Sequence, residues 1–146
     1  MLTEALLRQG LQGAMKAREM PSVYVLRGLL AAVANLKIEK GLPELSEAEI
    51  IGLVKREAKK CEEAEEFARR AGRGDLVEQN AGERAILARY LPRPLDDAEL
   101  TNLLRSWLAE GVTGIGALMA RLKERHPGQY DGKRASEIAR GLLTAG

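Results

Sequence analysis

Cysteine and histidine are almost absent from this 146-residue chain, which has one of each, Cys61 and His126. A single cysteine forms no internal disulfide and no multi-cysteine metal site, and this usage fits a reducing compartment. A single histidine excludes His-rich metal sites and argues against an internal Ser-His-Asp arrangement. The composition therefore argues against most enzyme classes, and we expect neither a metal nor a cofactor.

Long apolar runs and a strong excess of one charge are also lacking. No stretch approaches about 18 consecutive apolar residues, and the first ten residues carry Glu4 without a long apolar segment, unlike a secretory signal. Lys and Arg total 23 against 21 Asp and Glu. We therefore expect a cytoplasmic protein without a membrane partner, and this balance excludes both a disordered tail and a basic nucleic-acid coat.

Aromatic residues make up only 3% of the sequence, whereas Ala, Leu, Glu, Arg and Lys dominate. The straight-chain members of this set lose little side-chain freedom in a helix. No segment combines sustained alternation of apolar and polar residues with a hairpin turn, so no strand is expected. These features predict an all-α fold.

The helical pattern divides at Leu91-Pro92-Arg93-Pro94, because two prolines in three residues forbid a continuous helix. We predict an N-terminal domain, residues 1–93, with four mostly long helices, and a C-terminal domain, residues 94–146, with three short ones. The four N-terminal helices are expected at about 3–18, 22–40, 47–71 and 75–90. The three C-terminal helices are expected to open at Asp96, Thr113 and Asp131.

Several local expectations accompany this division. Ser46 with Glu49, and Asp96 with Glu99, have capping-box spacing, and Asp75 with Glu78 is expected to cap the fourth helix. Met20-Pro21 is expected to separate the first two helices. Gly10 and Gly13 should weaken the first helix by about 1 kcal/mol each relative to alanine, unless close packing uses the missing side chains.

The second half of the third predicted helix is rich in alanine and charge. Its acids, Glu62, Glu63, Glu65 and Glu66, precede arginines that favour a solvated charged surface over a catalytic pair of carboxylates. This half is therefore expected to face solvent, and it could project beyond the bundle.

Three other features offer weak signals for chemistry. Cys61 lies on the apolar stripe of its helix and is expected to be a buried structural thiol. His126 ends a helix, where a cation is favourable. Gly111, Gly114 and Gly116 lack the preceding strand and the lysine of a phosphate loop, so a tight interhelical turn is the better interpretation.

Basic residues gather near the C-terminus: from Arg105 onward there are seven against four acidic residues. Such an excess could contact a phosphate backbone, with help from the N-terminus of the last helix. An ordinary charged helical surface explains the same pattern equally well. The candidate RNA-binding residues are Arg121, Lys123, Arg125, Lys133, Arg134 and Arg140.

Three segments, residues 25–41, 66–92 and 115–143, resemble the YqeY-like proteins, also called GatB/YqeY domain proteins, and their order and spacing match along almost the whole chain. The most specific pieces are Arg27 in its apolar helix, the turn from Phe67 to Arg73-x-Asp75-Leu76, and Tyr90-Leu91-Pro92 before an acidic helix start. The resemblance implies an all-helical, two-domain bacterial protein. Its C-terminal part is similar to the tail domain of the B subunit of the glutamyl-tRNA(Gln)/aspartyl-tRNA(Asn) amidotransferase, a domain that helps to hold tRNA.

One departure bears on that implication. The family usually has Gly-Lys where this sequence has Gly116-Ala117, so a phosphate contact at that turn is in doubt.

The leading hypothesis is a non-catalytic, tRNA-associated helical module. A second is a protein-binding adaptor that docks a partner, such as an amidotransferase subunit, on the alanine-lined end of the third helix. An enzyme that itself transfers an amide, the label the family carries by association, is the third.

Overall fold

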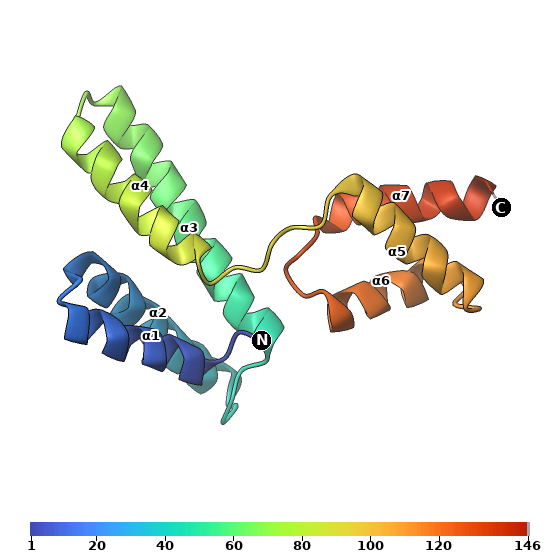
Figure 1. The fold of residues 1–146 in the computed structure, drawn as a ribbon, viewed down its shortest axis with the longest axis horizontal. Coiled ribbons are helices and arrows are strands. Elements are labelled where there is room, and N and C mark those ends of the chain that lie inside the picture. Colours follow the sequence, from blue (N-terminus) through green and yellow to red (C-terminus); the bar gives the residue numbers. More distant parts are fainter. Residues whose placement is uncertain (146) are drawn as a thin grey trace. The chain divides into compact units, whose positions relative to one another are not determined.

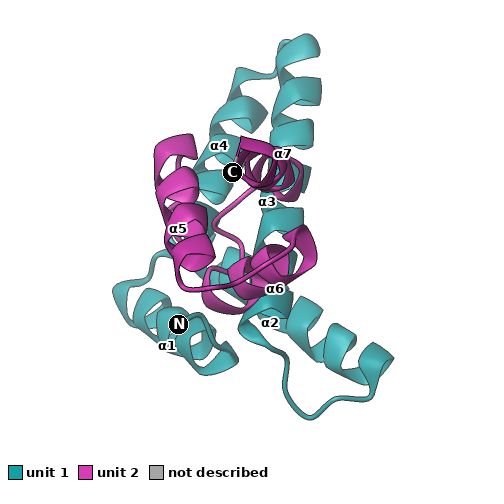
Figure 2. Cartoon of the chain, turned by 90° about the vertical axis from the view of Figure 1, so that its right-hand side faces the viewer, with its two compact units in different colours: residues 1–91 teal, residues 92–146 magenta. Residues whose placement is uncertain are grey.

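The computed structural model describes residues 1–145, which form seven helices and no strand, so the all-α prediction is confirmed (Figure 1). Its contacts divide the chain into two compact units, Met1–Leu91 and Pro92–Gly146 (Figure 2). The division falls two residues before the boundary expected from the two prolines. Unit 1 contains α1 (Glu4–Ala17), α2 (Met20–Lys40), α3 (Glu47–Arg70) and α4 (Gly74–Ala88). Unit 2 contains α5 (Asp97–Ala109), α6 (Ile115–Arg125) and α7 (Gly132–Ala145).

Helices α1 and α2 form a hairpin (Figure 1). The Thr3 side chain accepts a hydrogen bond from the Leu6 N–H and starts α1, and Arg18 ends it in a left-handed conformation, φ 57°. The expected break at Met20-Pro21 is wrong, because α2 begins at Met20. A proline in the first helical turn removes an N–H that would have no intrahelical partner, so it fits there without cost.

Helix α2 is apolar on most of its circumference. An 18-residue window of it reaches a mean hydropathy of 1.2, so by length and composition it passes the test for a membrane-spanning helix, contrary to the count of consecutive apolar residues. A mostly buried core helix of a soluble protein passes the same test, whereas 28% of this window is buried. Val23, Leu26, Leu29 and Val33 are each 1% exposed and form the centre of the unit 1 core.

Helices α3 and α4 form the second hairpin of unit 1. The capping box at Ser46 and Glu49 is confirmed. The expected cap at Asp75 is wrong: Arg73 holds the N-cap position, and Asp75 accepts from its guanidinium at 3.1 Å instead. The prediction that the second half of α3 faces solvent is also wrong in part, because Ala68 is buried where α3 runs along α4.

Unit 2 has a core of its own. Its buried residues are Leu100, Leu104 and Trp107 of α5, Leu118 and Leu122 of α6, and Ala135 and Ala139 of α7. The box of Asp96 and Glu99 caps α5 as expected. Thr113 does not open α6; Gly114 does, at φ 87°, a backbone conformation that disfavours a side chain. Before α7, the Asp131 carboxylate accepts from the Arg134 N–H at 3.0 Å.

Candidate nucleic-acid interface

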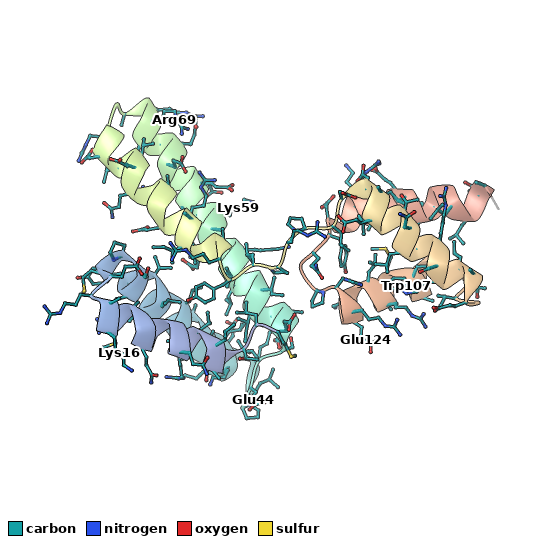
Figure 3. All side chains as sticks on the ribbon, in the orientation of Figure 1. Lys16, Glu44, Lys59, Arg69, Trp107 and Glu124 are labelled. Atoms are coloured by element: carbon teal, nitrogen blue, oxygen red, sulfur yellow. The ribbon has the colours of Figure 1, made fainter. Side chains whose placement is uncertain are left out.

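The six predicted RNA-binding cations lie on α6 and α7, and the structure separates them into two classes. Arg121 and Arg134 point to partners within unit 2. The Arg121 guanidinium lies 5.6 Å from the centre of the Trp107 ring and 3.1 Å from a Glu110 oxygen. Figure 3 marks Trp107 within unit 2. Arg121 therefore serves the packing of α5 against α6.

Arg134 is held more firmly still. Its guanidinium lies 2.9 Å from Asp97 of α5 and 3.2 Å from Glu137 of α7. These hydrogen bonds raise the pKa of Arg134 and lower the pKa of Asp97. Because both carboxylates offset its charge, Arg134 ties α7 to α5 and offers little net charge to an external phosphate.

The other four residues are exposed, and none has a carboxylate within 4.0 Å in the part of the chain that the structure describes. We call Lys123, Arg125, Lys133 and Arg140 the unit 2 cations. The first two belong to the last turns of α6. Lys133 and Arg140 are seven residues apart and share the face of α7 opposite the buried Ala135 and Ala139.

The N-terminus of α7 is less available to bind a phosphate than the sequence suggested. The Asp131 carboxylate already accepts from the Arg134 N–H, and its negative charge opposes an incoming phosphate. A phosphate contact near Lys133 would therefore rest on side chains rather than on backbone N–H groups.

The loop between α6 and α7 is fixed by Gln129. Its amide Nε2 donates to the Arg93 carbonyl at 3.0 Å, so its oxygen Oε1, 3.1 Å from His126 Nδ1, accepts. His126 therefore carries a proton on Nδ1, in the neutral ring or in the cation. Its ring lies 6.3 Å from that of Trp107, at the C-terminus of α6. His126 thus closes the end of the helix, where the sequence placed it.

Cys61 belongs to unit 1, beside α4, and is half-buried rather than fully buried. Its sulfur lies 4.0 Å from a Glu83 oxygen. Burial raises the pKa of the Cys61 thiol, and the negative charges of Glu83 and Glu57 add to this effect. A thiol held in its protonated form is a poor nucleophile.

The acidic cluster of α3 does not form a uniformly solvated surface. Glu65 is only 9% exposed, and its carboxylate lies 3.0 Å from Arg84 of α4 and 3.3 Å from Arg69. Glu62, Glu63 and Glu66 are exposed as expected. Glu65 lies on the face of α3 that packs on α4, so its carboxylate joins the two helices.

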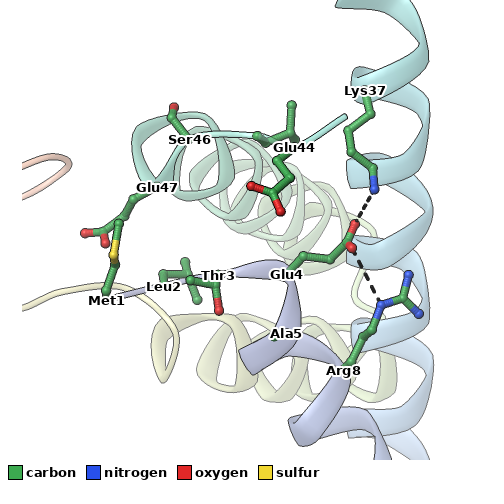
Figure 4. A pocket seen from close by; sticks show the side chains of 11 residues that line it. Met1, Leu2, Thr3, Glu4, Ala5, Arg8, Lys37, Glu44, Ser46 and Glu47 are labelled. Carbon is green, nitrogen blue, oxygen red and sulfur yellow. Dashed lines mark ion pairs between the residues drawn. The ribbon is translucent and has the colours of Figure 1, made fainter. Parts of the chain in front are cut away.

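A hollow of about 380 Å³ lies where the first residues and α1 meet the end of α2 and the start of α3. Figure 4 shows Glu4 between Lys37, at 2.8 Å, and Arg8, at 3.7 Å. The Lys37 hydrogen bond, against some desolvation, lowers the pKa of Glu4. These three charges are satisfied by one another. Among residues 1–145 no group of three or more His, Cys, Asp or Glu side chains could hold a metal ion.

Sequence reasoning missed one group of exposed cations, on α3 of unit 1. Lys55, Arg56 and Lys59 are exposed and have no carboxylate partner in the described residues, and Phe67, farther along the same helix, is 68% exposed. The sequence did indicate that Lys55 and Lys59 share a helix face, because they are spaced i, i+4. The abundant acids that follow concealed it, because a net charge summed over the helix is close to zero.

Comparison with known proteins gives one relative and one family. The chain is 24% identical over 143 residues to "Altered inheritance of mitochondria protein 41, mitochondrial" of Pyrenophora tritici-repentis, a match that covers 90% of this chain and 78% of the fungal protein. A family described as Yqey-like protein matches residues 4–143, which span both units. The chain belongs to the Yqey-like protein family.

Proposed function

We propose that this protein is a non-catalytic helical module that binds the phosphate backbone of tRNA through the unit 2 cations. The observation that carries the proposal is the absence of carboxylate partners around Lys123, Arg125, Lys133 and Arg140 in residues 92–145. A cation without a partner can neutralise a backbone phosphate, and the release of the counterions condensed on the nucleic acid drives binding.

The carboxylates of unit 2 are almost all engaged elsewhere. Four of its seven acids make ion pairs: Asp97, Glu99, Glu110 and Glu137. Asp96 and Asp131 accept from helix N–H groups. Glu124 alone remains without such a contact in the described residues, whereas Arg105 and the unit 2 cations have no acidic partner. The formal charge of unit 2 is +1, from eight basic and seven acidic residues, and its cations without an acidic partner in the described chain are Arg105 and the unit 2 cations.

The choice of tRNA rests on the resemblance of the C-terminal domain, residues 94–146, to the tail domain of the amidotransferase B subunit. Ala117, where the YqeY-like proteins usually have lysine, is exposed in the first turns of α6 and offers no charge. The proposed contact therefore uses the C-terminal end of α6 and the outer face of α7. It does not use the turn before α6.

A salt-dependent gel shift with purified tRNA tests the proposal. Replacing all four unit 2 cations with glutamine should weaken binding and lower the slope of log K against log salt by about 3, at 0.7–0.9 for each lost phosphate contact. The single variants Lys133→Gln and Arg105→Gln form a matched pair, because both remove one exposed, unpaired charge. Only Lys133→Gln should reduce affinity.

Two results would contradict the proposal. The first is that the parent protein does not retard tRNA, or that the fourfold variant binds with unchanged affinity and salt slope. The second is release of ammonia from glutamine by the purified protein, lost on Cys61→Ala, which would show an amide-transfer chemistry of its own.

A further inference from the structure

The outer face of α3 carries a group of exposed cations. Residues 55–60 read Lys-Arg-Glu-Ala-Lys-Lys, with four cations and one acid. Lys55 and Lys59 are one helical turn apart, as are Arg56 and Lys60, so these two pairs form adjacent rows on one face. All four are exposed, whereas the opposite face of this segment carries the buried Val54. Figure 3 shows Lys59 on the side of α3 away from α4.

Three of these four cations have no carboxylate partner in the described chain. Lys60 lies 3.2 Å from Glu57, and Lys55, Arg56 and Lys59 make no ion pair there. Farther along the same face, Glu66 is offset by Arg70 at 3.2 Å and Arg69 at 2.9 Å. Glu62, seven residues after Lys55, and Glu63, four residues after Lys59, are the exposed acids of that face without a cationic partner in the described chain. The net charge of the face is therefore positive.

Phe67 stands on the same side of this helix. It is 68% exposed, and it follows Lys60 by seven residues and Glu63 by four, which keeps it on the charged face. The axial distance from Lys59 to Phe67 is about 12 Å, at 1.5 Å per residue. A single exposed phenylalanine is ordinary on a protein surface. What sets this one apart is that it shares the outer face of the helix with Lys55, Arg56 and Lys59, farther along and beyond Glu62 and Glu63.

We propose that the outer face of α3 binds single-stranded RNA, with Lys55, Arg56 and Lys59 on consecutive phosphates and Phe67 stacked on a base. Non-sequence-specific binding of single strands combines these two elements, a positive track for the backbone and an aromatic platform for the bases. An acidic peptide would need the cations but not the phenyl ring. A single strand uses both.

This surface is separate from the unit 2 cations and does not depend on them. The proposal extends the function above, because it gives unit 1 its own contact with nucleic acid. It also predicts a different class of site: the unit 2 cations offer charge alone, whereas α3 offers charge and stacking. The two proposals therefore respond to different substitutions.

Fluorescence anisotropy with a labelled 12-nucleotide oligouridylate and the full chain tests the proposal. Lys55→Gln with Lys59→Gln should lower the salt slope by about 1.4, at 0.7 for each single-strand phosphate contact. The matched control is Lys16→Gln with Arg89→Gln, which removes two exposed, unpaired cations from α1 and from the end of α4. The control should bind as the parent does. Far-UV circular dichroism confirms that each variant remains helical.

Substitutions of Phe67 give the decisive test of base stacking. Phe67→Ala should reduce affinity about 10-fold or more without changing the salt slope, and Phe67→Trp should preserve affinity. Polyglutamate, a polyanion without bases, should compete much less well than unlabelled oligouridylate. If Phe67→Ala binds as the parent does and polyglutamate competes equally, the face fits an acidic protein and the proposal is overturned. An equal loss in the Lys16 and Arg89 control overturns it as well.

The same assay separates this inference from the proposed function. If the fourfold unit 2 variant loses tRNA and oligouridylate binding while the α3 variants bind as the parent does, the α3 site is refuted and the unit 2 site stands. If only the α3 variants lose binding, the unit 2 site is refuted instead.

Discussion

At the scale of single residues, Gly10 shows how one missing side chain positions an element. A Cβ added at Gly10 would overlap the Tyr90 hydroxyl and lie 3.2 Å from its ring and 3.4 Å from Leu26. Tyr90 belongs to the last residues of unit 1, so α1 can approach them only because position 10 has no side chain. The sequence marked Gly10 as a weakness of α1, with close packing as its one justification, and the structure supplies that justification.

Substitution of Gly10 and Gly13 with alanine should therefore have opposite effects. Gly13 meets nothing within 4 Å, so Gly13→Ala should stabilise the protein by about 0.5–1 kcal/mol through helix propensity. Gly10→Ala should gain the same stability from helix propensity. It should lose about 1–3 kcal/mol to overpacking, so the net effect is a destabilisation. Urea denaturation gives both values. Tyr90→Phe in the Gly10→Ala background should recover part of the loss, and equal stabilisation by both alanines would refute the close approach.

At the scale of elements, the capping boxes place charged side chains where their ionisation supports the fold. The Lys40 ammonium, with the Ser46 cap, lowers the pKa of Glu49 to about 2, and the Arg93 guanidinium, with the Asp96 cap, does the same for Glu99. Glutamate in an unfolded chain titrates near 4.3. A group whose pKa is lower in the folded state supplies stability above its unfolded pKa, and this stability is lost as the pH falls toward the folded value.

Glu49→Gln combined with Glu99→Gln should therefore reduce thermal stability most above pH 5, and the difference from the parent should close as the pH approaches 2. Glutamine can still accept and donate at the cap, so the variant isolates the charge. Melting temperatures measured between pH 2 and pH 6 give the difference curve. Glu78→Gln, an exposed acid without an ion pair in the described chain, is the control and should show no such trend. A constant difference at every pH would refute the assignment.

The elements also show where sequence reasoning succeeds. Helix type and number followed from composition and spacing, and the caps at Ser46 and Asp96 followed from a local rule, because one side chain bonds a backbone group three residues away. Two expected caps failed within the same window. Gly114, next to Thr113, begins α6 through its positive φ, and Asp75 accepts from the guanidinium of Arg73, two residues before it.

At the scale of the whole molecule, the sequence predicts which cations are present but not which of them form ion pairs. The six cations of α6 and α7 were all visible in the sequence. Their division into paired and unpaired groups was not, because Asp97 lies 37 residues before Arg134 and Glu110 lies 11 before Arg121. Long-range pairs of this kind depend on how helices pack, and helical periodicity carries no information about them. A candidate interface can be proposed from sequence as a set of residues, but only the fold selects its members.

Each unit builds its core from its own residues, and this predicts how the chain loses structure. Leu104 is fully buried among the seven core residues of unit 2. Leu104→Ala should cost about 2–5 kcal/mol, and a core from about 50 residues rarely supplies more than 3–5 kcal/mol. Amide hydrogen exchange on the intact variant should therefore show lost protection throughout α5, α6 and α7, with α1 to α4 protected as in the parent. Leu143→Ala, 37% exposed in the parent, should change little. Equal loss of protection in both units after Leu104→Ala would mean that the two cores unfold as one.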